Sequence, residues 1–119
     1  MIKIPHVVVE GKLEGGKVFE NLEPILIKQD NLLIRTTNSF ISKDESMILV
    51  ETLVIEEGIK SQFFAVISER DDGIVIRIYP GTDVEKTNGV KKSLADLGKQ
   101  ILQKFPETKI GKTNLSEFL

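Results

Sequence analysis

The chain contains no cysteine and no tryptophan, and it has a single histidine, His6. The absence of cysteine excludes disulfides, thiolate catalysis and cysteine-based zinc sites, and it is typical of a reducing compartment. One histidine cannot build a multi-histidine metal centre, and beside Val7 in an extended segment His6 is better interpreted as structural than as a general base. Abundant Ile, Lys and Glu, without Cys or Trp, are typical of thermophilic proteins. The composition therefore argues against several large classes of enzyme.

Long apolar runs are also missing. No run approaches the roughly 18 residues that a membrane-spanning helix needs, and the N-terminal residues lack the apolar core and cleavage site of a signal peptide. We therefore expect a cytoplasmic protein without membrane association. At 119 residues the chain is long enough to bury a core of its own as one domain.

No motif for catalysis or cofactor binding is complete. Ile110–Thr113 matches the end of a phosphate-binding P-loop, but Pro106 stands where the first glycine is required, and a P-loop would follow a strand. Asp71 and Asp72 lack the spaced oxygen ligands of a calcium loop. The sequence predicts no metal and no cofactor. It leaves enzymatic activity undecided, with scattered carboxylates and arginines as the remaining candidates for catalysis.

The strongest structural pattern is a pair of apolar runs around residue 70. Phe63–Ile67 is apolar at every position, which is typical of a strand covered on both faces. Ile74–Tyr79 alternates with a period of two, and Arg70–Gly73 between the runs supplies turn residues. This pattern predicts a central β-hairpin with Ile67 opposite Ile76.

Other extended segments surround this hairpin. We predict turns at Glu14–Lys17 and Gln29–Asn31, and a mobile loop at Asn38–Ser46. Pro5 has no backbone N–H to donate to a neighbouring strand, so it places the first strand at an edge of the sheet or at a bend. The predicted strands are Ile2–Ile4, His6–Glu10, Val18–Phe19, Pro24–Lys28, Asn31–Thr37 and Met47–Glu56.

After Gly81 the apolar period changes to that of a helix. Asn88 is a candidate N-cap, and Pro106 ends the pattern. The apolar stripe consists of Val90, Leu94, Leu97, Ile101 and Phe105. Residues 1–106 are therefore expected to form one α+β domain, an antiparallel sheet of six or seven strands packed by one C-terminal amphipathic helix. The same element order is compatible with a pleckstrin-homology-like barrel, and residues 107–119 are expected to form a tail.

Charge is unevenly distributed along the chain. Residues 86–112 contain seven lysines against Asp96 and Glu107. The lysines form either a solvated helix face or a basic face that binds DNA.

Three residues are candidate contacts for an anion or small ligand. Arg35, Arg77 and Tyr79 would converge if their strands were neighbours, and they would then border a pocket between helix and sheet. Cross-strand ion pairs with Glu51 or Glu69 account for the same arginines at lower cost, so the sequence favours them.

The last residues form an apolar cluster. Leu115, Phe118 and Leu119 fall on one side of a single helical turn, which must dock on its own domain or on another protein. Together with Lys112, they resemble the PIP-box by which replication and repair proteins bind the sliding clamp PCNA. The resemblance implies that Leu115 is the aliphatic plug and that Phe118 and Leu119 form the inserted pair, whereas Lys112 replaces the usual glutamine.

These patterns favour a small binding or adaptor protein over an enzyme. The clamp resemblance predicts an accessory protein of DNA replication or repair whose partners are a sliding clamp and DNA. The alternatives are a small-ligand-binding domain and a structural homo-oligomer in which the tail packs on its own domain.

Overall fold

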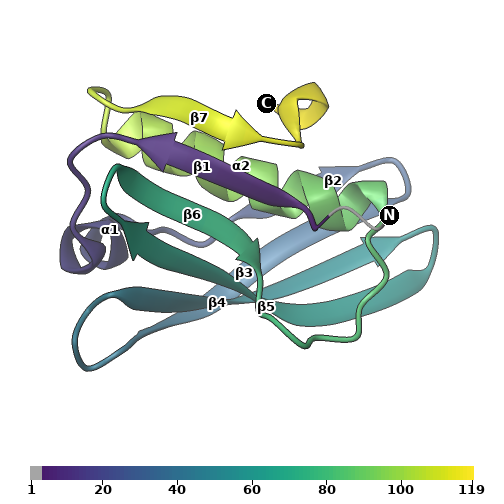
Figure 1. Ribbon diagram of the computed structural model, residues 1–119. Helices are drawn as coiled ribbons and strands as arrows, with labels where there is room; N and C mark the ends of the chain where they lie inside the picture. The colour runs from purple at the N-terminus through teal and green to yellow at the C-terminus, as the bar shows by residue number, and fades with distance from the viewer. Residues whose placement is uncertain (1–3) are drawn as a thin grey trace.

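Seven antiparallel strands form one sheet that curls like a half-barrel around a long helix (Figure 1). The structure is a computed structural model that describes residues 4–119; the predicted strand at Ile2–Ile4 lies largely outside these residues, and Ile4 is not in a strand. The sheet order is β2-β3-β4-β5-β6-β1-β7. The strands are β1 (His6–Glu10), β2 (Leu26–Gln29), β3 (Leu32–Ile41), β4 (Met47–Glu56), β5 (Ile59–Arg70), β6 (Gly73–Ile78) and β7 (Lys109–Thr113). The helices are α1 (Gly15–Asn21), α2 (Asn88–Lys104) and the short 3₁₀ helix η1 (Ser116–Phe118).

The predicted central hairpin is formed by β5 and β6, and its register is confirmed. Ile67 lies opposite Ile76, and Asp71 and Asp72 form the turn between the strands. Gly73 follows this turn with φ 153°, and a Cβ atom there would overlap the carbonyl oxygen of Val9. Glycine therefore permits β1 to pair closely with the other edge of β6.

Helix α2 lies across the concave face of the sheet and seals the core. The predicted stripe is confirmed, because Val90, Leu94, Leu97 and Ile101 are all buried. Thr87, one residue before the predicted cap, accepts the hydrogen bond from the Val90 amide. The α+β prediction of a seven-stranded antiparallel sheet packed by this helix is confirmed.

Two local predictions were wrong. The turn predicted at Glu14–Lys17 is the start of α1, where the Gly15 amide donates to Glu69 Oε2 at 2.6 Å and Val18 is buried. Tertiary contacts therefore overcome the poor helix propensity of two adjacent glycines. The loop predicted at Asn38–Ser46 is shorter than expected, since β3 continues to Ile41 and only residues 42–46 connect it to β4.

The segment after Pro106 is part of the sheet rather than a separate tail. Its strand β7 pairs with β1 and forms one edge of the sheet, while β2 forms the other. The sheet is therefore open, so the barrel alternative is not formed. Within residues 4–119, no helix is long and apolar enough to cross a membrane.

Candidate functional site: the outer face of the sheet

The strand register divides the side chains of the sheet between two faces. In β4, Ile48, Val50 and Val54 are buried on the inner face, toward α2. The alternate side chains of β3, β4 and β5 point to the outer face, which α2 does not cover. We call one group of apolar residues on this face the outer apolar surface: Phe40, Met47, Leu49, Leu53, Phe64, Val66 and Tyr79.

Aromatic side chains are the most exposed part of this surface. Phe40 is 50%, Phe64 38% and Tyr79 46% exposed. The rings of Phe40 and Phe64 meet edge to face, with centroids 6.3 Å apart. The backbone amide of Tyr79 donates to the Phe64 carbonyl at 2.9 Å, so these two residues are neighbours. Three aromatic residues from separate strands or strand ends thus belong to one face.

The expectation that the run Phe63–Ile67 is covered on both faces holds on its inner side, but on its outer side it holds for Val66 and not for Phe64. Phe63, Ala65 and Ile67 are buried beneath α2, whereas Phe64 is exposed. Val66 is buried on the outer face, where it lies between Leu49 and Arg77 in a cross-strand row. The outward positions of β5 are therefore mixed: Phe64 and Val66 are apolar, whereas the others are polar or charged.

A depression of about 600 Å³ lies beside the exposed aromatics. This outer depression is lined by Arg35, Glu51, Leu53, Gln62, Phe64 and Tyr79, together with neighbouring backbone and threonine side chains. It brings together two of the three predicted ligand contacts, Arg35 and Tyr79. Arg77 does not line the depression, because it lies opposite Val66, four residues along β5 from Gln62. The Nε atom of Arg77 is buried and has no hydrogen-bond partner within residues 4–119.

Arg35 and Tyr79 do not lie in the predicted pocket between helix and sheet. Arg35 follows the inward-facing Ile34, and Tyr79 follows the inward-facing Ile78, so both point away from α2. Any ligand that contacts them binds on the outer face instead.

The ion pairs predicted for the arginines are also not formed. Glu51 accepts hydrogen bonds from Asn38 Nδ2 at 2.8 Å and from Thr37 Oγ1 at 3.3 Å. Glu69 is engaged by α1, as described above. Within residues 4–119, neither Arg35 nor Arg77 forms an ion pair.

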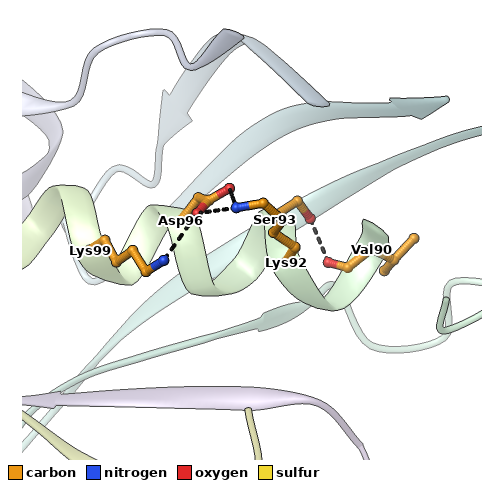
Figure 2. Close-up of polar contacts among 5 residues, drawn as sticks. All are labelled: Val90, Lys92, Ser93, Asp96 and Lys99. Atoms are coloured by element: carbon orange, nitrogen blue, oxygen red, sulfur yellow. Dashed lines mark hydrogen bonds and ion pairs between the residues drawn. The ribbon is translucent and has the colours of Figure 1, made fainter. Parts of the chain in front are cut away.

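Three of the four lysines of α2 lie near a carboxylate, and two of these three share the same one. Figure 2 shows Asp96 between Lys92 and Lys99, whose Nζ atoms lie 3.2 and 3.9 Å from its Oδ1. Lys104 Nζ lies 2.7 Å from Glu23 Oε1. Lys91 forms no ion pair within residues 4–119, and DNA binding by this helix stays a prediction.

The residues of the PIP-box-like motif lie against the domain. Lys112 is exposed in β7, and Leu115 is only 2% exposed within the core. Phe118 packs against the same core from η1, while Leu119 is 37% exposed. The Asn114 side chain fastens this segment to the start of β1 by donating to the Ile4 carbonyl at 2.9 Å. Clamp binding stays a prediction, and it requires Leu115 to leave its buried position.

The chemistry of the chain gives no other strong candidate. Among residues 4–119 there is no group of three or more His, Asp or Glu side chains arranged to hold a metal ion. Comparisons of the chain with protein-family models, with curated proteins and with solved structures find no match. The functional argument therefore rests on the geometry of the outer face.

Sequence reasoning missed Phe40, Met47 and Phe64 as functional candidates. A signal for them was present, because β4 and β5 carry apolar residues at both odd and even positions. The register of the strands was needed to show that α2 does not cover one of these two sets of apolar side chains.

Proposed function

We propose that the protein is a non-catalytic binding module that holds a partner protein on its outer apolar surface. The observation that carries this proposal is that β4 has apolar residues at most of its outward as well as its inward positions, and that α2 covers only the inward ones. Antiparallel sheets with one solvated face normally alternate apolar and polar residues. A contiguous exposed apolar patch marks an interaction site.

The composition of the face favours a protein partner. Interface cores are enriched in aromatic residues, Met and Arg and depleted in Lys, Glu and Asp. The exposed aromatics, Met47 and Arg35 follow this pattern. Glu51 is the single acid among the outward positions of β3 to β6, and Lys60 is the single lysine.

Charge and shape favour a different protein over a second copy of this chain. Arg35, Lys60 and Arg77 form no ion pair within residues 4–119, so two stacked outer faces would bring cations together. The sheet curls around α2, so the outer face is convex, and two convex faces meet over a small area. The partner that fits is apolar at its centre and acidic at its rim.

The test uses a random peptide library displayed on phage and selected against the purified protein. Peptides that bind the outer apolar surface lose about tenfold or more in affinity for the Phe40→Ser, Phe64→Ser double variant, because aromatic anchors dominate interface energetics. The matched control is Ile59→Ser, which removes an even more exposed apolar side chain at the start of β5, at a position of the opposite alternation to Phe64. Amide shifts in NMR spectra locate the bound peptide.

Two outcomes overturn the proposal. One is a selection whose peptides bind the double variant as tightly as the unaltered protein. The other is sedimentation of the unaltered protein as a dimer that the double variant converts to monomer, which assigns the surface to a second copy.

A further inference from the structure

We infer that the outer depression is a specificity pocket for an apolar side chain next to a carboxylate in the partner. This inference rests on the proposed function and names the chemistry by which the partner is selected. The depression has an apolar floor from Leu53 and Phe64, a cation from Arg35, and polar groups from Gln62 and Tyr79. Its volume of about 600 Å³ is within the range of sites that bury small ligands or anchoring side chains.

The cross-strand register explains this arrangement. Arg35 on β3 lies opposite Leu53 on β4, which lies opposite Gln62 on β5. Phe64 is two residues along β5 from Gln62, so it shares the outer face, and Tyr79 is hydrogen-bonded to it. The cation and the phenol therefore lie at two sides of an apolar floor.

Arg35 keeps its hydrogen-bonding capacity because the acid in the depression is engaged elsewhere. The ladder between β3 and β4 is irregular between Thr36 and Ser39, where an extra residue is accommodated. Thr37 and Asn38, the two residues in this bulge, both donate to Glu51. Arg35 forms no ion pair with any of residues 4–119, so its planar fork of donors is free.

A carboxylate fits this site better than a phosphate chain. A planar guanidinium binds a carboxylate through two parallel hydrogen bonds. Nucleic acids are held by several cations that follow the backbone, whereas Arg35 is the single cation lining the depression and Glu51 lies in the same lining. The apolar floor indicates that an aliphatic or aromatic side chain enters beside the anion.

The test compares two capped hexapeptides by NMR titration. One has the sequence Ser-Asp-Leu-Phe-Asp-Ser, and in the other both aspartates are asparagines. The protein binds the acidic peptide about tenfold more tightly, as a charge-assisted bidentate contact implies. Arg35→Gln removes this preference. The matched control Arg70→Gln retains it, because Arg70 is paired with Asp72 at 3.3 Å in the β5–β6 turn.

Salt adds a second readout. Raising the NaCl concentration weakens binding of the acidic peptide to the unaltered protein and leaves its binding to Arg35→Gln nearly constant. A merely structural role for Arg35 would lower the affinity for both peptides equally and would not change their salt dependence.

The outcomes separate this inference from the proposed function. Equal affinity for the two peptides, or no binding of the acidic peptide up to about 1 mM, overturns the specificity pocket. Peptides from the library that are lost on the Phe40→Ser, Phe64→Ser variant would still support a protein-binding surface. Displacement of the acidic peptide by a labelled oligouridylate overturns the inference in favour of single-stranded nucleic acid.

Discussion

The two faces of the sheet are built from the same strands, but α2 covers only the inner face. On the inner face of β4 and β5, apolar side chains such as Ile48 and Ile67 are almost completely buried beneath α2. On the outer face, the alternate positions include Met47 and Phe64, which remain exposed. The inner face supplies the stability of the domain, and the outer face retains apolar surface that the fold leaves exposed.

This division has an energetic basis. Burying one large apolar side chain contributes about 1.5 to 3 kcal/mol relative to leaving it exposed. For the inner face that free energy is realised on folding. For the exposed rings of Phe40 and Phe64 part of it remains available for binding, so changes on the two faces should have separable effects.

The largest expected effect comes from the inner face. Leu94 is fully buried on α2, and Leu94→Ala leaves a cavity between helix and sheet. We expect the free energy of unfolding to fall by about 3 kcal/mol, as is usual for large-to-small core substitutions. Urea unfolding followed by circular dichroism measures this loss.

The outer face provides the control for this experiment. Phe64→Ala removes a side chain of similar size that is already partly solvated, so the expected loss of stability is under about 1 kcal/mol. A loss as large as that of Leu94→Ala would contradict the division between the faces, because it would show that Phe64 contributes mainly to folding.

The next largest effect concerns the end of the inner core. Leu115 is buried at the edge beside α2, and we expect Leu115→Ala to lower the free energy of unfolding by about 2 kcal/mol. The control is Leu119→Ala, which alters an exposed side chain and changes stability by no more than about 0.5 kcal/mol. Thermal unfolding of the two variants gives the comparison.

The same pair of variants bears on the PIP-box resemblance. If Leu115→Ala unfolds at the same temperature as the unaltered protein but loses binding to a sliding clamp, the segment serves a partner rather than the core. A loss of stability without measurable clamp binding assigns Leu115 to the domain itself.

Much of the fold follows from local patterns in the sequence. The central hairpin was predictable because alternation in β6 and the turn residues before Gly73 agree with each other, and α2 was predictable from its apolar stripe. By contrast, α1 depends on contacts from distant residues, including the bond between Gly15 and Glu69, which no local pattern reveals. Strand β7 was missed because its pairing with β1 joins residues about a hundred positions apart.

The candidate site was only partly predictable for a similar reason. Arg35 and Tyr79 were identified by residue type, but their common depression depends on a register that spans β3, β4 and β5. The pairing of Glu51 was mispredicted because the β-bulge presents Thr37 and Asn38 to it, and a bulge cannot be located from alternation alone.

The smallest expected effect comes from the turn between β3 and β4, which helps to fix which residues face inward. Asp44 Oδ1 accepts hydrogen bonds from the hydroxyls of Ser46 and Ser42, each at 2.8 Å, and from the Ser46 amide at 3.1 Å. The Ser46 hydroxyl, followed by that of Ser42, lowers the pKa of Asp44 from its usual 3.8.

Because the folded-state pKa is lowered, this carboxylate stabilises the fold fully above pH 3.8 and loses its contribution as the pH falls through the folded-state pKa. Asp44→Asn keeps an acceptor oxygen but removes the charge, so the variant should have a slightly lower urea midpoint than the unaltered protein at about pH 6 and a smaller deficit at about pH 3. A deficit that is the same at both pH values would show that the hydrogen-bond geometry of the turn, rather than the charge of Asp44, holds β3 and β4 in register. In that case the assignment of side chains to the two faces would depend on backbone shape alone.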